Sequence, residues 1–291
     1  MIVIYNPAAG RRRAALLWRV LDVLATNGVR LDLTRTASAG HAVALAREAA
    51  ASGAEIVVAA GGDGTIAEVA RGLQGTDAAL GIIPLGTANV LANELGLSFA
   101  PRDCAAALAF GRTRPLWPGL ATGAHGTRLF VQMLGVGFDA SVVHHLSLRL
   151  KRIAGKGAYV AQSLREMARY DFPAVTVRLD GVAAQAASVV VTKGRLYAGR
   201  YVLAPAACPA EPGFQVALFG CAPPLGGPLG AALYGAALPL NLLPRAPGLR
   251  LVRAREIEVS AALPAQTDGD PAGQAPLCIA DAPTPLRVVV G

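Results

Sequence analysis

The chain has 291 residues, of which 53% are hydrophobic and 16% are charged. This composition excludes a disordered protein, and the length fits two folded domains. Lys and Arg number 27 against 19 Asp and Glu, and the net charge of +8 favours anionic partners such as a lipid surface or nucleotide phosphates. Nucleic acid is disfavoured as a partner, because aromatic residues make up only 5% of the chain and do not alternate with basic ones.

The first part of the chain, residues 1–112, alternates between strand and helix patterns. Short apolar runs bounded by turn residues predict strands at 1–5, 30–36, 55–60 and 79–84. Apolar residues at helical spacing predict helices at 11–27, 40–52, 65–73 and 90–97. This order is typical of an α/β domain in which a parallel sheet carries helices on both faces.

Residues 113–291 contain mostly strand patterns. Strands are predicted at 128–134, 174–181, 186–194, 213–220, 256–263 and 286–290. Helical patterns are confined to 141–150 and 155–170. An Asp-Gly pair at 180–181, between two strand patterns, predicts a hairpin. We therefore expect a second domain that is mostly an antiparallel β-sandwich.

One apolar segment raises the question of a membrane. Residues 221–244 carry no charge over 24 residues, a length that could span a bilayer. Five prolines and four glycines in the segment argue against a regular spanning helix. We predict a loop and a short apolar helix, which either touches a membrane surface or packs in the core.

Cysteine usage and the N-terminus favour a cytoplasmic protein. The four cysteines are widely spaced and form no Cys-x-x-Cys pair, which indicates free thiols in a reducing cytosol. The apolar run at the start has no basic residues before it, so it does not resemble a signal peptide.

A glycine-rich loop follows the third predicted strand. Residues 61–65 read Gly-Gly-Asp-Gly-Thr and precede a predicted helix. At the carboxyl edge of a parallel sheet, glycines let backbone N–H groups approach a phosphate, and a helix N-terminus adds unpaired donors. Thr65 can cap the helix and reach a phosphate oxygen, and Asp63 is suited to hold Mg²⁺ or to accept a hydroxyl proton. The alternative is a glycine-rich turn with an aspartate cap.

Two further loops follow neighbouring strands. Gly86, Thr87 and Asn89 come after the next strand, and residues 6–10 come after the first strand, directly before Arg11–Arg13. Because successive parallel strands end at one edge of a sheet, we expect these loops to converge on one crevice. The phosphate-binding sequence GxxxxGK[ST] is absent, so Mg²⁺ and arginines would have to neutralise the phosphates.

Two other patterns are weaker signals. Residues 135–140 read GVGFDA and match GxGxxA, but they lie outside a βαβ series, which disfavours dinucleotide binding there. His144 and His145 are adjacent, point in different directions and cannot bind one metal ion together. We expect both histidines to be surface or core residues.

A pair of aspartates stands near the end of the chain. Asp268 and Asp270 flank Gly269, and residues two apart on an extended strand face the same side. Such a pair suits a general base beside a residue that orients it or a metal. The alternative is an ordinary Asp-Gly turn between two strands.

Together these motifs resemble the diacylglycerol kinase catalytic family, which includes bacterial lipid kinases and sphingosine kinases and is distantly related to NAD kinases. The pair GGDGT at 61–65 and PLGTAN at 84–89 carries the resemblance, and YNPAAG, GVGFDA, LKRIAGKGAYV and QTDGD follow in the family's order along nearly the whole chain. The resemblance implies an α/β nucleotide domain at 1–112, a β-sandwich lipid domain at 113–291 and an active site between them.

The resemblance also implies residue roles. Asp270 stands where the family has a glutamate that is its proposed general base, and its side chain is one methylene shorter. Asp63 would organise Mg²⁺ with ATP or act more directly in catalysis. The residues that would bind ATP are Asn6, Thr36, Gly61, Gly62, Asp63, Gly64, Thr65, Gly86 and Thr87.

One segment departs from the family. Some bacterial members bind a structural Mg²⁺ through an acidic Asp-Gly segment that follows an APxA stretch. The corresponding run here, 204–214, has Pro212 in place of that aspartate, and Glu211 is the carboxylate left nearby. We therefore predict that this accessory metal site is absent or weakened.

Three hypotheses follow. The first is an ATP-dependent lipid kinase with diacylglycerol as its substrate, peripheral at the inner face of the membrane. The second is a kinase for another hydroxyl, in a sphingoid base, a phosphatidylglycerol-like lipid or NAD, with NAD disfavoured because lipid-kinase motifs continue after residue 84. The third is a binding protein that has lost catalysis, which Pro212 and the shorter Asp270 would explain. The sequence leaves the oligomeric state open, a homodimer included.

Overall fold

The computed structural model describes residues 1–8, 14–124, 126–146 and 156–291, and the chain divides into two compact units. Unit 1 comprises Met1–Trp117 and Pro283–Gly291, and unit 2 comprises Pro118–Ala282. The sequence pattern places the boundary at 112–113 and assigns the last strand to the second domain. The structure differs there, because this strand pairs with the sheet of unit 1.

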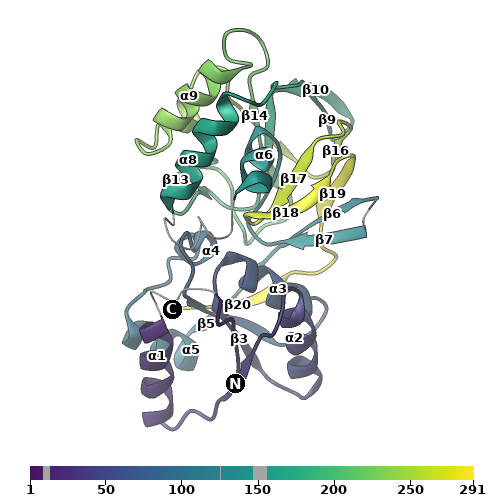
Figure 1. The fold of residues 1–291 in the computed structure, drawn as a ribbon. Coiled ribbons are helices and arrows are strands. Elements are labelled where there is room, and N and C mark those ends of the chain that lie inside the picture. Colours follow the sequence, from purple (N-terminus) through teal and green to yellow (C-terminus); the bar gives the residue numbers. More distant parts are fainter. Residues whose placement is uncertain (9–13, 125, 147–155) are drawn as a thin grey trace. The chain divides into compact units, whose positions relative to one another are not determined.

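Unit 1 is the predicted α/β domain (Figure 1). Its strands are β1 (Ile2–Tyr5), β2 (Asp32–Arg35), β3 (Ile56–Gly61), β4 (Ala79–Pro84), β5 (Arg112–Leu116) and β20 (Leu286–Val290). They form one sheet in the order β2-β1-β3-β4-β20-β5, and the pairs are parallel except for β20 with β5. Its helices are α1 (Ala14–Thr26), α2 (His41–Ala51), α3 (Asp63–Leu73), α4 (Val90–Glu94) and α5 (Pro101–Phe110).

Helices cover both faces of this sheet. On one face α1 packs against α5, and the apolar stripe of α1 is buried with sheet residues such as Val58 and Ile83. On the other face α2 packs against α3. The arrangement leaves the strand ends, and the loops that follow them, at the edges of the sheet.

Unit 2 consists mostly of antiparallel strands, as predicted. One sheet has the order β10-β9-β16-β19-β6-β7, formed by Val182–Ala186, Val175–Leu179, Ile257–Val259, Leu277–Asp281, Gly119–Gly123 and Gly126–Phe130. The other has the order β15-β14-β11-β8-β17-β18, formed by Arg250–Ala254, Phe214–Phe219, Ser188–Thr192, Met133–Gly137, Pro264–Thr267 and Asp270–Gln274. Smaller elements are β12 (Leu196–Tyr197), β13 (Tyr201–Val202), α6 (Phe138–His145), α8 (Lys156–Met167), α9 (Pro228–Ala237) and η2 (Leu243–Arg245).

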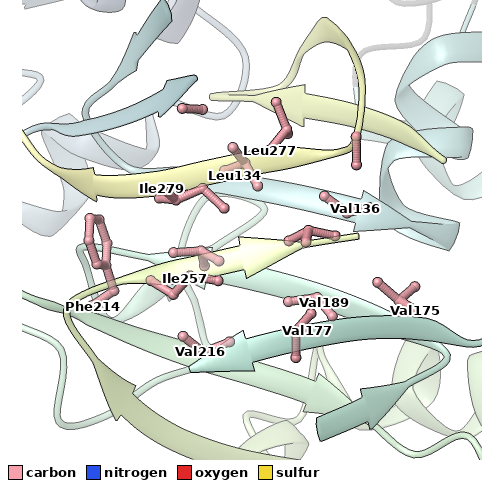
Figure 2. Packing of buried hydrophobic residues seen from close by; sticks show 14 of the residues in the cluster. Leu134, Val136, Val175, Val177, Val189, Phe214, Val216, Ile257, Leu277 and Ile279 are labelled. Atoms are coloured by element: carbon pink, nitrogen blue, oxygen red, sulfur yellow. The ribbon is translucent and has the colours of Figure 1, made fainter. Parts of the chain in front are cut away.

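The two sheets of unit 2 share one apolar core (Figure 2). Along β9 the residues alternate, so that Val175 and Val177 are buried and Arg178 is exposed. Val189 and Val216 of the other sheet belong to the same buried cluster. This alternation is what a sheet with one buried face requires, and it makes unit 2 a β-sandwich.

Two segments of unit 2 bear on the sequence-based expectations. The strand expected at 128–134 is interrupted at residues 131–132, where β7 ends and β8 has not begun. The segment 221–244 forms turns, the short helix α9 and the turn η2. No helix in the described ranges is long and apolar enough to cross a membrane.

Candidate active site

Several loops of unit 1 leave the sheet along one edge. β1 pairs in register with the parallel strands β2 and β3, and β3 pairs with β4 as far as Gly61 and Pro84. The residues directly after these strands therefore form one row at the carboxyl edge, the edge at which open α/β sheets bind ligands. The row includes Asn6, Thr36, Gly62 and Leu85.

The two glycine loops lie against each other. A Cβ atom built on Gly86 would come within 2.6 Å of the Gly62 Cα and 2.8 Å of the Asn89 Oδ1. A Cβ on Gly61 would come within 2.5 Å of the Thr65 side chain. A larger residue at position 86 would push the two loops apart, and one at position 61 would displace Thr65, so these glycines allow close packing. The predicted convergence of the two loops is confirmed.

Helix α3 begins inside the first loop, at Asp63, with Gly62 as its N-cap. The Gly62 carbonyl accepts the first helical hydrogen bond, from the Ile66 N–H at 3.0 Å. The N–H groups of Asp63, Gly64 and Thr65 therefore have no acceptor in the helical ladder and stand at the positive end of the helix dipole. A helix start of this kind suits a phosphate.

Thr65 does not cap α3, and that prediction is wrong because Thr65 is the third residue of the helix. It is buried, and its Oγ1 accepts a hydrogen bond from the Asn6 Nδ2 at 3.0 Å. The Asn6 Oδ1 accepts one from the Ala8 N–H at 2.9 Å. Thr65 therefore joins the loop after β1 to the loop after β3. Gly10 and Arg11–Arg13 lie outside the described residues.

Asp63 joins the two glycine loops. Its Oδ1 accepts a hydrogen bond from the Val90 N–H at 2.7 Å, at the start of α4. Burial raises the pKa of Asp63, while hydrogen bonds from backbone N–H groups at Val90, Leu91 and Asn89 oppose that rise. Asp63 is therefore a capping aspartate, as the alternative interpretation of the loop predicts, but it caps α4 and not its own helix α3.

Asn89 supplies a buried acceptor beside the glycines. It has φ 48° and is only 1% exposed, and its Nδ2 donates to the Gly86 carbonyl at 2.8 Å. Its Oδ1 has no hydrogen-bond partner within the described part of the chain. An unsatisfied buried acceptor beside a helix N-terminus fits a ligand that carries phosphates and a cation. The residues present therefore fit a nucleotide with Mg²⁺.

The two threonines differ in their surroundings. Thr36 is buried directly after β2, and its N–H donates to the Tyr5 carbonyl at 2.9 Å. Thr87 is exposed in the second glycine loop. Thr36 therefore belongs to the same edge of the sheet as Asn6, and Thr87 offers a hydroxyl to solvent.

Glu68 is a residue that sequence reasoning missed. Its Oε1 accepts a hydrogen bond from the Gly40 N–H at 2.8 Å, and its Oε2 accepts one from the Ala42 N–H at 3.3 Å. Glu68 thus caps the first turn of α2 from its place on α3 and ties the two helices together. The one hint in the sequence is that α2 begins after Gly40, which has no side chain to cap the helix.

In unit 2 the turn between β17 and β18 consists of Asp268 and Gly269. Their φ angles are 50° and 83°, as in the type I′ turns that favour Asp-Gly. The Asp268 carboxylate accepts three backbone hydrogen bonds at 2.8–3.0 Å, from the N–H groups of residues 131–133. Asp268 is therefore a structural acceptor that holds the break between β7 and β8.

Asp270 has a different position from Asp268. It is partly buried and begins β18, where it pairs with Thr267. The two aspartates do not stand on one extended strand, because Asp268 lies in the turn. The expectation that they form a pair on one side is wrong for this reason.

A buried polar network underlies this turn. The Gln266 Oε1 accepts a hydrogen bond from the Gly269 N–H, and its Nε2 donates to the Asp139 Oδ2, both at 2.8 Å. The Tyr197 hydroxyl donates to the Asp139 Oδ1. Burial raises the pKa of Asp139, and the hydrogen bonds from Tyr197 and Gln266 oppose that rise. The network connects α6 to the turn before Asp270.

The network explains the GVGFDA sequence. A Cβ on Gly135 would overlap the Asp139 carboxylate, so this glycine makes room for the network. β8 is antiparallel to both of its neighbours, β11 and β17, and no βαβ unit surrounds it. These glycines therefore serve internal packing and not a dinucleotide.

The adjacent histidines lie at the surface, at the end of α6. The His145 Nδ1 lies 3.3 Å from the Glu166 Oε1, and both histidines are exposed. Within the described ranges, no group of three or more His, Cys, Asp or Glu side chains could hold a metal ion.

Comparison with known proteins identifies the family. The family model of the diacylglycerol kinase catalytic domain matches residues 1–120. A YegS-like probable lipid kinase of Pseudomonas putida is 32% identical over 273 residues, which are 91% of this chain and 87% of the relative. The chain belongs to the diacylglycerol kinase catalytic family.

Two further comparisons agree with this assignment. A diacylglycerol kinase of Bacillus subtilis is 32% identical over 186 residues, which are 62% of this chain and 59% of the relative. A crystal structure of a diacylglycerol kinase from Bacillus anthracis has a TM-score of 0.78 at 21% identity and covers 100% of this chain and 96% of its own. It shows that the diacylglycerol kinase fold is present, and the resemblance of the motifs is confirmed.

Proposed function

We propose that this chain is an ATP-dependent lipid kinase that transfers the γ-phosphate of ATP to the hydroxyl of diacylglycerol and so makes phosphatidic acid. The observation that supports this most is the contact between Gly62 and Gly86, which brings the two family motifs together at the start of α3. Membership of a family whose relatives include lipid kinases supports a lipid as the acceptor.

The nucleotide half of the reaction belongs to unit 1. The N–H groups at the start of α3 would bind phosphate oxygens, and Asn6, Thr36, Gly86 and Thr87 would surround the rest of ATP. The carboxylate of Asp63 and the Oδ1 of Asn89 are the oxygens that would hold Mg²⁺. Bound with ATP, this ion would offset the charge of the phosphates.

Asp270 is the proposed general base. The lipid hydroxyl gives its proton to the Asp270 carboxylate while its oxygen bonds to the γ-phosphorus. The bond from that phosphorus to the bridging oxygen breaks, and ADP leaves. Asp268 has a structural role instead, because its carboxylate holds the backbone N–H groups of residues 131–133 at the break between β7 and β8.

The test is phosphorylation of lipids from γ-labelled ATP. Purified protein, Mg²⁺ and mixed micelles containing diacylglycerol, a sphingoid base or phosphatidylglycerol are incubated, and the labelled lipids are separated by chromatography. We expect label in phosphatidic acid, and little label with the Asp63→Asn variant. Label in a different lipid would replace diacylglycerol by that acceptor. Bound ATP without label in any lipid would favour a protein that has lost catalysis.

We further propose that unit 2 meets an anionic bilayer through an apolar surface on α8, α9 and the residues after α9. Among the described large apolar side chains that are exposed, six lie there: Val160, Leu164, Leu229, Leu233, Leu240 and Leu242. α8 and α9 are in contact, and each shows two of these side chains four residues apart, hence on one face.

Charge favours an anionic lipid as the partner of this surface. The sequence has no acidic residue from 212 to 255, but it has arginines at 245, 250, 253 and 255. An apolar surface with basic residues beside it is typical of peripheral binding to anionic membranes. A homodimer that buried the same surface is the alternative.

Flotation with liposomes tests this surface. We expect the protein to float with phosphatidylglycerol-containing liposomes and the double variant Leu229→Ser/Leu233→Ser to float much less. Phe110→Ser is the matched control, because Phe110 is 82% exposed on α5 of unit 1. Equal flotation of both variants would contradict the proposal, and a change from dimer to monomer in the double variant would favour self-association.

A further inference from the structure

Lys193 is a buried lysine just after β11, and it is one of three lysines in the chain. Its side chain is 0% exposed. The ammonium nitrogen lies 2.6 Å from the Asp281 Oδ1, 2.7 Å from the Gly213 carbonyl oxygen and 3.2 Å from the Glu211 carbonyl oxygen. Three oxygens from two distant segments thus surround one cation.

The surroundings of Lys193 match an ammonium group. An ammonium has three N–H donors, and these three oxygens supply one acceptor for each. The Phe214 ring lies beneath the charge, with its centre 4.5 Å from the nitrogen. Burial lowers the pKa of Lys193, and the hydrogen bond and charge of Asp281 oppose that fall. An isolated buried ammonium would be costly, but here each proton has a partner.

Asp281 connects the cation to the segment 204–214. Its second oxygen, Oδ2, accepts a hydrogen bond from the Gly213 N–H at 2.6 Å. The Asp281 carboxylate therefore binds both the ammonium and the backbone of this segment. Together with the two carbonyls at residues 211 and 213, it fixes the segment to β19.

The accessory Mg²⁺ expected in some relatives does not fit this segment. A carboxylate and two backbone carbonyls are oxygen ligands of the kind that Mg²⁺ uses, but the Lys193 ammonium already stands among them. Pro212 offers no side-chain oxygen, and the Glu211 carboxylate is exposed and lies 3.5 Å from the Arg253 guanidinium. A second cation beside the ammonium would be repelled.

We propose that the ammonium of Lys193 is a built-in cation that takes the place of the accessory Mg²⁺ and holds the segment 204–214 without metal. The inference is independent of the proposed kinase activity, because it concerns the folded segment alone. It accounts for Pro212, since a protein that carries its own cation has no need of the aspartate at that position.

Hydrogen–deuterium exchange of the nucleotide-free wild-type protein is the first test. The readout is the protection of peptides within 204–219, measured in EDTA, in millimolar MgCl₂ and in millimolar CaCl₂. We expect the same protection in all three conditions. Protection that rises with Mg²⁺ and saturates would overturn the proposal, whatever the variants below do.

Variants of Lys193 are the second test. We expect Lys193→Met to raise the exchange rate in this segment at least about tenfold, because Asp281 loses its counter-ion. The control is Arg178→Met, since Arg178 is exposed and lies 3.9 Å from the exposed Glu258. Unchanged exchange in Lys193→Met would overturn the proposal.

A double variant tests whether the segment 204–214 can bind Mg²⁺ once the ammonium is removed. Lys193→Asn with Pro212→Asp removes the ammonium and restores a carboxylate before Gly213. We expect this variant to be protected in MgCl₂ and to lose that protection in EDTA. Protection that is equally high in EDTA and in MgCl₂ would show that the segment needs no cation, and it would overturn the proposal.

Discussion

Two hairpins of unit 2 turn on the same pair of residues. Asp180-Gly181 joins β9 to β10, and Asp268-Gly269 joins β17 to β18. All four residues have positive φ angles, of 46°, 86°, 50° and 83°. Both aspartates also bind backbone N–H groups of another segment, at residues 255–256 for Asp180 and at residues 131–133 for Asp268.

The two turns differ in what surrounds them. Asp180-Gly181 is followed by Val182, which is 71% exposed. Asp268-Gly269 is followed by Asp270, and the Gly269 N–H donates a hydrogen bond to the Gln266 Oε1. The turn is thus a structural device that the chain uses in two places. The candidate chemistry comes from the carboxylate after one of the turns and from the buried network beneath it.

The largest difference in kcat should come from substitutions of the residue that follows each turn. Asp270→Asn should lower kcat for lipid phosphorylation by at least about 100-fold, because the proposed base loses its proton-accepting charge. Val182→Asn, the same position after the other turn, should leave kcat unchanged. Both are measured with the γ-labelled ATP assay and checked for folding by circular dichroism. Full activity in Asp270→Asn would remove Asp270 from the mechanism.

The aspartates of the two turns should differ in stability. Asp268→Ala leaves three backbone N–H groups without their acceptor in a partly buried place, and it should lower the free energy of unfolding by about 3 kcal/mol. Asp180→Ala should cost less, because water can reach the N–H groups that this exposed side chain binds. Urea unfolding of the two variants compares them. A larger loss in Asp180→Ala would contradict this account.

The contribution of Asp139, in the network under the second turn, to the stability of the protein should depend on pH. The pKa of Asp139 is raised in the folded protein, so its buried charge costs stability at neutral pH. That cost disappears as pH falls below the ordinary aspartate value of 3.8. Asp139→Asn should therefore gain Tm relative to wild type at pH 7, and the gain should shrink towards pH 4.

The opposite trend, a gain in Tm that grows as pH falls, would refute this account of Asp139.

Asp180 is the matched comparison at the first turn. Backbone hydrogen bonds from residues 256 and 255 lower its pKa. Its contribution to stability is therefore present above the ordinary aspartate pKa and is lost as pH falls through the lowered value. Asp180→Asn should accordingly lose Tm relative to wild type at pH 7, and this loss should shrink in acid.

The smallest expected effect is on the free energy of unfolding when the glycine of either turn is replaced, and the loss should be the same at both turns. Gly181→Ala and Gly269→Ala each place a Cβ on a residue with positive φ, which costs about 1 kcal/mol. No atom lies within 4 Å of the new Cβ at Gly181, and the nearest at Gly269 is the Tyr159 hydroxyl at 3.9 Å. Urea unfolding should give equal losses. A much larger loss at Gly269 would reveal a steric constraint specific to the second turn.

Much of the fold could be predicted because its signals are local. Alternating strand and helix patterns gave the parallel sheet of unit 1, and Asp180-Gly181 gave a hairpin in the right place. The glycine loops were expected to converge because parallel strands end at a common edge. These predictions needed no knowledge of which distant residues meet.

The remainder depended on distant partners. Asp63 caps a helix that starts 27 residues later, and Lys193 meets a carboxylate 88 residues away. Nothing in the sequence near either residue marks the partner. A threonine beside a helix start predicts a cap, because Ser and Thr are common caps, but in the structure Gly62 holds that position. The apolar run 286–290 predicted a strand without indicating the sheet that it joins.

Strand β20 has a consequence for biosynthesis. It lies between β4 and β5 in the sheet of unit 1, yet it follows the whole of unit 2 in the chain. On the ribosome, β5 therefore waits without a neighbour until the last strand has emerged. Unit 1 is thus begun first and completed last, and during that interval its open sheet edge is exposed to mispairing.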